Sequence, residues 1–161
     1  MSHWIIIDGY NLLHAWTPPQ GPGQIDSLRD RMNERLMGNF RALCTHMTVV
    51  FDGKQAGSGD FETPSQFDIV FTGKGASADA HIEALSYRAK SPETLTVVSS
   101  DRGLQETVHI RGCRTLPCPT FISEWESAEQ RGSQRRTTAQ RTHQKRVGPF
   151  GRLGDVFPDD L

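Results

Sequence analysis

The sequence predicts an α/β fold in which a mostly parallel central sheet is flanked by helices. Three apolar runs carry this prediction, because each ends at an aspartate close to a glycine; they are residues 4–8, 48–52 and 95–101. Runs that are apolar at consecutive positions are typical of parallel strands buried on both faces. Amphipathic helical patterns separate the runs, so the strand ends should meet at one edge of the sheet, where open α/β sheets bind ligands.

The first fifty residues predict a strand, a helix and a second strand. Residues 4–8 form the first strand, and Gly9 then lets the backbone turn. Prolines and glycines in 12–23 predict a loop beside the strand end. From Gln24, apolar residues recur every three or four positions, which predicts a helix leading to strand 48–52 by a right-handed crossover. The charged residues of this helix, interpreted as its solvated face, are Asp26, Arg29, Asp30, Glu34 and Arg35.

The second half predicts the same alternation. A glycine-rich loop over 53–66 precedes a third strand at 67–71, and Ser77 is expected to cap the next helix. Strand 95–100 is followed by a short helix over 102–110 and by a short edge strand at 113–116. Thr120 is expected to cap a last helix.

Charge divides the chain into a core and a tail. The formal net charge is −1, but residues 1–130 carry 11 Lys and Arg against 16 Asp and Glu, whereas 131–152 hold seven basic residues and no acid. We therefore expect one domain over 1–130 and a tail over 131–161 that is basic and then acidic. With no large apolar group over 131–146, this tail should be disordered on its own. It is either a solvating extension or, as we favour, a contact for RNA or the ribosome.

The three cysteines, Cys44, Cys113 and Cys118, form no C-x-x-C pair, which argues against a zinc ribbon or a disulfide framework. A sparse, odd set fits a reducing cytoplasm. The amino-terminal apolar run is too short for a signal peptide or a membrane span. These features predict a cytoplasmic protein without membrane contact.

Acidic residues should gather where the strands end. Asp8, Asp52 and Asp101 follow strands, and Asp79 opens a helix with Glu83 one turn later. Any one of these acids could instead be a helix cap or turn residue, and for Asp79 that alternative is strong. Together, however, they would repel one another unless a cation lay between them. An all-oxygen donor set favours Mg²⁺ or Mn²⁺, which can activate a water for phosphodiester hydrolysis.

Polar and basic residues near this edge could serve the same chemistry. Asn11 and Ser99 could orient water or phosphate by hydrogen bonds, and Lys74 and Arg102, near helix N-termini, could contact phosphates. For both cations an ordinary surface charge is an equally good interpretation. Tyr10 and Trp16 could stack on an unpaired base, although packing is the better interpretation of both.

Four motifs resemble one known family in order and spacing. They are Asp8-Gly9-Tyr10-Asn11, Phe51-Asp52, Ala78-Asp79-x-x-Ile82-Glu83 and Ser99-x-Asp101, and the similarity runs from about residue 4 to 126. The chain thereby resembles the NYN nuclease domain, in its YacP-like bacterial branch of the PIN-like superfamily. The resemblance implies a three-layer α/β fold, a metal-dependent endoribonuclease activity and, for some members, action on ribosome-bound messenger RNA. It also implies that Asp8, Asp79 and Asp101 bind metal, that Asn11 is their polar partner and that Asp52 is an additional carboxylate.

The function expected is therefore a metal-dependent endoribonuclease that cuts single-stranded or ribosome-associated RNA with Mg²⁺ or Mn²⁺. Two rivals stay open: a non-catalytic RNA-binding module of the same fold, and a metal-dependent phosphatase that acts on a small phosphorylated metabolite. The sequence carries no Walker-type phosphate loop, since Gly73-Lys74-Gly75 has the wrong spacing, and no G-x-S-x-G motif. An NTPase and a covalent serine hydrolase are thus disfavoured. The oligomeric state is not predicted.

Overall fold

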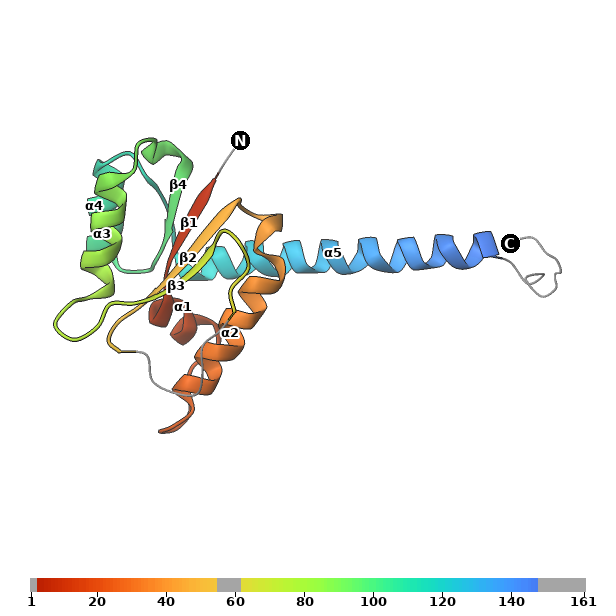
Figure 1. The fold of residues 1–161 in the computed structure, drawn as a ribbon, viewed down its shortest axis with the longest axis horizontal. Helices are drawn as coiled ribbons and strands as arrows, with labels where there is room; N and C mark the ends of the chain where they lie inside the picture. The colour runs from red at the N-terminus through yellow and green to blue at the C-terminus, as the bar shows by residue number, and fades with distance from the viewer. Residues whose placement is uncertain (1–2, 55–61, 148–161) are drawn as a thin grey trace. The chain divides into compact units, whose positions relative to one another are not determined.

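The structure is a computed structural model that describes residues 3–54 and 62–147. Its five strands form one sheet in the order β3-β2-β1-β4-β5, and every neighbouring pair is parallel (Figure 1). The strands are β1 (Trp4–Asp8), β2 (His46–Phe51), β3 (Phe67–Phe71), β4 (Leu95–Val98) and β5 (Arg114–Leu116). The predicted parallel α/β sheet is confirmed, with β3 and β5 at its edges.

Helices cover both faces of the sheet, which gives three layers. In Figure 1, α1 (Gly9–Trp16) and α2 (Ile25–Asn39) lie on one side, and α3 (Ala78–Arg88) and α4 (Arg102–Ile110) lie together on the other. The remaining elements are the short 3-10 turns η1 (Phe40–Ala42) and η2 (Pro92–Thr94) and the last helix, α5 (Cys118–Val147). No helix in the described part of the chain is long and apolar enough to cross a membrane.

The alternation of side chains along the strands determines which face receives the functional residues. Ile6, Val50 and Val97 all belong to the buried cluster that packs against α3 and α4. Successive strand residues point to opposite faces, so the residue two positions further along points to the same face as these three. Those residues are Asp8, the last residue of β1, Asp52, directly after β2, and Ser99, directly after β4. Three neighbouring strands thus direct a polar side chain to the α3 and α4 side at their carboxyl ends.

Helix α1 replaces the first part of a predicted loop. Residues 12–16 were expected to be irregular, but the chain enters a helix directly after Asp8 and keeps it to Trp16. The prolines lie beyond the end of α1, and proline disfavours helix at its own position and the one before it, not several residues upstream. Leu12 and Leu13 are fully buried, so packing stabilises this turn of helix.

The charged face predicted for α2 is not wholly solvated. Arg29 retains only 3% of its exposure and Asn33 only 1%. The guanidinium of Arg29 donates to Asp26 Oδ1 at 2.9 Å and to Asp30 Oδ1 at 3.2 Å, which offsets the cost of burying its charge. The interpretation of Arg29 as a surface charge was therefore wrong.

Helix α5 begins earlier and ends later than expected. It starts at Cys118 rather than after Thr120, and it continues to Val147 through the stretch for which disorder was predicted. The missing apolar residues were the basis of that prediction, but Arg, Gln, Lys and Ala are strong helix formers, and extending an existing helix costs far less than starting one.

By its contacts the chain divides into two compact units, Met1–Glu124 and Trp125–Leu161. The glycine-rich loop and the acidic end of the tail lie largely or wholly outside the described residues.

Candidate active site

Asp8, Ser99 and Asp101 form one hydrogen-bonded chain at the carboxyl ends of β1 and β4. The Ser99 hydroxyl donates to Asp8 Oδ2 at 3.0 Å and accepts from the backbone N–H of Asp101 at 3.1 Å. Asp101 Oδ1 accepts from the N–H of Leu104 at 3.0 Å and so caps α4. Ser99 is fully buried, and its position fits a role in orienting Asp8 rather than direct contact with a substrate.

Asp52 and Asp79 approach from the other side of β1. Asp52 Oδ1 accepts a hydrogen bond from the backbone N–H of Ala78, which ties the start of α3 to the end of β2. Ser77 caps this helix as predicted, since its hydroxyl accepts from the N–H of Ala80 at 3.0 Å. Asp79 therefore stands in the first turn of a helix whose position is set by Asp52.

The electrostatics of the acids show that they are close. The pKa of Asp8 is raised to about 6, chiefly by burial and also by the charges of Asp79, Asp52 and Asp101, against the opposing effect of the hydrogen bond from Ser99. Burial also raises the pKa of Asp79, with contributions from Asp101, Asp52 and Glu83. The charges of Asp52, Asp79 and Asp101 thus act on Asp8 at this edge of the sheet. Such a concentration of negative charge favours a bound cation.

The donor set fits a hydrated divalent ion better than a fully protein-ligated one. In the residues that the structure describes, no three His, Cys, Asp or Glu side chains are grouped closely enough to hold a metal ion. Asp8, Asp52 and Asp101 each engage one carboxylate oxygen in a hydrogen bond within the protein, which leaves the second oxygen available. Mg²⁺ commonly takes only one or two carboxylates and keeps several waters. Oxygen donors without His or Cys also suit Mg²⁺ or Mn²⁺ rather than Zn²⁺.

Asn11 is held at the border of the cluster by a residue that the sequence analysis did not single out. Asn11 Oδ1 accepts from the backbone N–H of Ser100 at 2.7 Å and from the Cys118 thiol at 3.1 Å. The backbone N–H of Cys118 in turn donates to the Ser100 hydroxyl at 3.0 Å. Cys118 is fully buried and lies 107 residues from Asn11, so no local pattern could have indicated this contact.

The two predicted phosphate contacts are exposed and lie at helix starts. Lys74 stands in the turn between Gly73 and Gly75, both of which have positive φ, and Arg102 is the first residue of α4. Within the described part of the chain, neither side chain bonds to the acids. Their proposed role therefore depends on their place beside the N-termini of α3 and α4.

The aromatic residues near the site pack within the protein. Tyr10 meets Phe51 edge-on at a centroid distance of 4.9 Å, and the guanidinium of Arg35 lies 4.3 Å from the ring centre of Trp16. Arg29 donates to the Tyr10 hydroxyl at 3.4 Å and also lies 5.2 Å from the ring centre of Phe71. These contacts fit the packing interpretation of Tyr10 and Trp16.

Gly9 matters for a different reason from the one expected. Its φ is not positive, but a Cβ built at this position would overlap the Phe51 ring. Phe51 is fully buried and stacked on Phe71 at 5.3 Å, so it has no room to withdraw. The glycine between Asp8 and Tyr10 is required because α1 lies directly against the end of β2.

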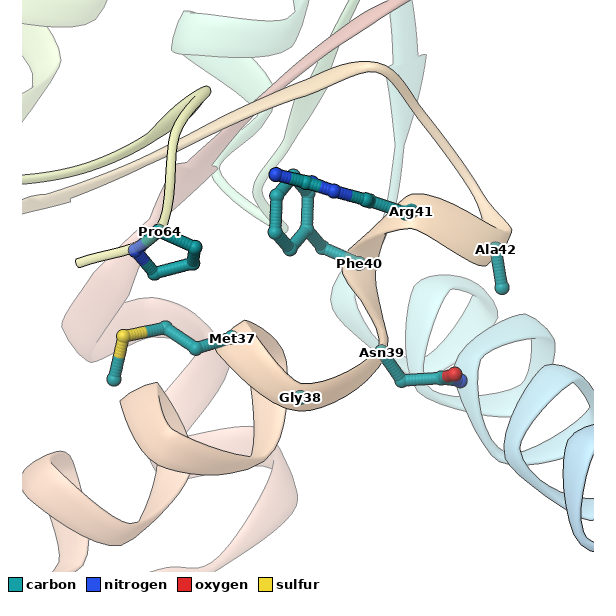
Figure 2. Close-up of a pocket in the computed structure, with 7 residues that line it drawn as sticks. All are labelled: Met37, Gly38, Asn39, Phe40, Arg41, Ala42 and Pro64. Carbon is teal, nitrogen blue, oxygen red and sulfur yellow. The ribbon is translucent and has the colours of Figure 1, made fainter.

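A separate pocket lies near the opposite end of the strands. It has a volume of about 300 Å³ and lies between the end of α2, η1 and the segment that leads into β3. Figure 2 shows Phe40 and the Arg41 side chain, which stacks on it, across from Pro64. None of the cluster residues lines this pocket. The acidic cluster, with its strand and helix ends, is therefore the better candidate site.

Comparison with known proteins gives the family. Two crystal structures of Rae1 (YacP) from Bacillus subtilis resemble this one. The first has a TM-score of 0.73 at 23% identity and covers 98% of this chain and 91% of that chain; a mutant form has a TM-score of 0.68 at 22% identity and covers 85% and 84%. At this identity the likeness concerns the fold, which it confirms, and no curated protein matches the chain. The sequence profile of the YacP-like NYN domain matches residues 5–149. This chain belongs to the YacP-like NYN domain family, which has a nuclease-type, PIN-like fold.

Proposed function

We propose that this chain is a metal-dependent endoribonuclease that hydrolyses phosphodiester bonds in single-stranded or ribosome-associated RNA, and that its nuclease domain spans residues 1–130. The observation that carries the proposal is the cluster of Asp8, Asp52, Asp79 and Asp101, in which burial, together with the charges of the other three acids, raises the pKa of Asp8 to about 6. Membership of the NYN domain family supports the nuclease assignment.

The acidic residues and Ser99 would have different roles in metal binding. Asp8, Asp79 and Asp101 would hold one or two Mg²⁺ or Mn²⁺ ions, in part through the water molecules that such ions retain, and Asp52 would add a further carboxylate. A bound ion of this kind lowers the pKa of a water molecule and offsets the charge that develops on the leaving oxygen. Ser99 keeps Asp8 oriented through its 3.0 Å hydrogen bond, which fixes the direction of the remaining carboxylate oxygen.

Substrate binding would use neutral and positive groups around the acids. Lys74 and Arg102 would contact phosphates beside the N-termini of α3 and α4, where the helix dipole favours negative charge. Asn11 would bind a phosphate oxygen or a water. Such contacts position an RNA strand without reading its sequence.

Cleavage of a long unstructured RNA tests the proposal. We expect cutting with Mn²⁺, none with EDTA, and a loss of roughly a thousandfold in Asp8→Asn, since a metal centre contributes several kcal/mol to the transition state. Asp68→Asn is the matched control, because Asp68 is an exposed acid of β3 paired with His46. Binding of RNA without cutting would instead indicate a binding module. Hydrolysis of a small phosphate ester with intact RNA would indicate a phosphatase.

We further propose that the protein is cytoplasmic and that its basic tail contacts RNA, including RNA on the ribosome. Arg131, Arg135 and Arg136 are exposed on α5, in the stretch that carries seven basic residues without an acid. Replacing all three with Gln keeps good helix formers and removes three positive charges. We expect weaker RNA binding and a salt dependence whose slope falls by about 2, since each phosphate contact to a single strand contributes about 0.7. Arg31→Gln, an exposed change on α2, is the control; an unchanged slope in the triple variant would remove the tail from the proposal.

A further inference from the structure

The side-chain amide of Asn11 is engaged through its oxygen alone. Oδ1 accepts from the Ser100 N–H at 2.7 Å and from the Cys118 thiol at 3.1 Å, and an amide oxygen has two lone pairs. A backbone N–H can only donate, so the oxygen and not the nitrogen must face Ser100. In the described part of the chain Nδ2 makes no hydrogen bond. Its two N–H groups are therefore what Asn11 can offer to the site.

We propose that Asn11 acts as a hydrogen-bond donor, through Nδ2, to a non-bridging phosphate oxygen of the substrate, and that the Cys118 thiol is the positioning residue that holds the amide in this orientation. The inference rests on the proposed function and deepens it. A metal ion would need Oδ1, whose two lone pairs are already engaged by Ser100 and Cys118. Asn11 thus belongs to the substrate contacts and not to the metal ligands.

The surroundings of Cys118 suit this role. Cys118 and Asn11 bind Ser100 from two sides, because the Cys118 N–H donates to the Ser100 hydroxyl while Asn11 Oδ1 accepts from the Ser100 N–H. Ser100 lies between Ser99, which donates to Asp8, and Asp101, which belongs to the acidic cluster. The start of α5 is thereby coupled to the cluster in two ways, through the thiol of Cys118 on Asn11 and through its backbone N–H on Ser100. Burial raises the pKa of the Cys118 thiol, so the group keeps the proton that it donates.

Substitutions at Cys118 separate the hydrogen bond from the volume of the side chain. Cys118→Ser keeps a donor, whereas Cys118→Val keeps bulk without one. We expect the valine variant to lower kcat about five- to tenfold, the value of one ordinary hydrogen bond, with KM little changed, and the serine variant to stay within about twofold of wild type. Cys44→Val makes the same change at a buried cysteine near the start of β2, away from the cluster, and should leave kcat unchanged. Equal losses in the serine and valine variants would overturn the positioning role, and so would wild-type rates in both.

The NMR signals of the Asn11 side-chain amide provide a readout that does not depend on cleavage. We expect two well-separated Nδ2 proton resonances in wild type and Cys118→Ser, and resonances that move together in Cys118→Val because the amide is no longer held. A short single-stranded RNA should shift these resonances in wild type. Unaltered amide signals in the valine variant would overturn the role of Cys118, and the absence of a shift with RNA would overturn the donor role.

Asn11→Asp tests the direction of the hydrogen bond. The carboxylate has nearly the same shape and can still accept from Ser100 and Cys118, but it has no N–H to donate. We expect cleavage to fall about a hundredfold, as for the loss of one preorganised donor, without weaker Mn²⁺ binding. Full activity with tighter Mn²⁺ binding would identify Asn11 as a metal ligand and overturn the inference. If wild type itself cuts no RNA, the proposed function fails, while the amide spectra still decide the role of Cys118.

Discussion

The two ends of the parallel sheet carry polar groups of similar kinds that are arranged in opposite ways. At the amino ends of the strands, His46 Nε2 lies 2.6 Å from Asp68 Oδ2, Thr48 donates to the same oxygen at 3.3 Å, and the rings of Trp4 and His46 stack at 4.8 Å. At the carboxyl ends, Asp8 faces other acids, and its pKa is raised to about 6. The amino end satisfies its acid within the protein, whereas the carboxyl end retains a charge that is not compensated.

This difference indicates that the functional end of the sheet is the one whose acids lower the stability of the fold. An acid beside a histidine and a hydroxyl has partners for its charge, so it needs no ligand. Acids that raise one another's pKa are maintained against a cost, and groups perturbed in this way concentrate at functional sites. The predictions below test whether the carboxyl end really carries this cost and the amino end does not.

The largest effect on stability is expected from Gly9→Ala, and Gly38→Ala, near the other end of the sheet, provides the contrast. Gly9→Ala should lower the free energy of unfolding by about 2 to 3 kcal/mol, because the new methyl group overlaps the buried Phe51 ring. Gly38→Ala, at the pocket near the amino ends, meets no atom within 4 Å and should raise stability by up to about 1 kcal/mol, since alanine is the better helix former. Urea unfolding of both variants measures the contrast. Combining Gly9→Ala with Phe51→Leu should recover part of the loss, and no recovery would mean that Phe51 is not the obstacle.

The next effect is a gain in stability from removing the charge of Asp8. The pKa of Asp8 is higher in the folded protein than the ordinary 3.8, so folding favours the protonated form, and the stability penalty develops as pH rises through about 4 to 6 and is complete above 6. The shift to about 6 corresponds to roughly 3 kcal/mol, and partial exposure to water reduces it to about 2. Asp8→Asn should therefore unfold at higher urea than wild type at pH 8 in EDTA, and this advantage should disappear near pH 4. A destabilised Asp8→Asn protein at pH 8 would show that the acids do not repel one another.

The same ionisation should limit cleavage at low pH. Between pH 7.5 and pH 5, with Mn²⁺ below saturation, the fraction of ionised Asp8 falls about tenfold for a pKa of about 6, and we expect kcat/KM to fall by at least this factor. The dependence follows from the free enzyme, so saturating Mn²⁺ should move the fall to lower pH. If the pH dependence of kcat/KM were the same at low and at saturating Mn²⁺, Asp8 would not be a metal ligand.

Most strands and helices of the fold could be predicted from the sequence, because both produce short-range patterns of apolar residues. The carboxyl ends of three strands were predicted as the site from apolar runs that stop at Asp8, Asp52 and Asp101. The helix over 12–16 was not predicted because the prolines that follow it were taken to exclude helix several residues upstream, whereas a proline disfavours helix only at its own position and the one before it. The contacts of Arg29 with Tyr10 and of Cys118 with Asn11 join segments 19 and 107 residues apart, so only the folded arrangement reveals them.

The smallest effect is expected at the amino end, where the hydrogen bond between His46 and Asp68 is weakened. The side chains retain 30% and 54% of their exposure, and exposed pairs of this kind are worth less than about 1 kcal/mol. Asp68→Asn should therefore change stability by less than this amount and leave RNA cleavage unaltered, in contrast with the same substitution at Asp8. Urea unfolding and the cleavage assay, run on both variants side by side, measure the contrast. A loss of cleavage in Asp68→Asn comparable to that in Asp8→Asn would mean that the two ends of the sheet are not functionally distinct, because an acid at the far end would then be as necessary as Asp8 in the cluster.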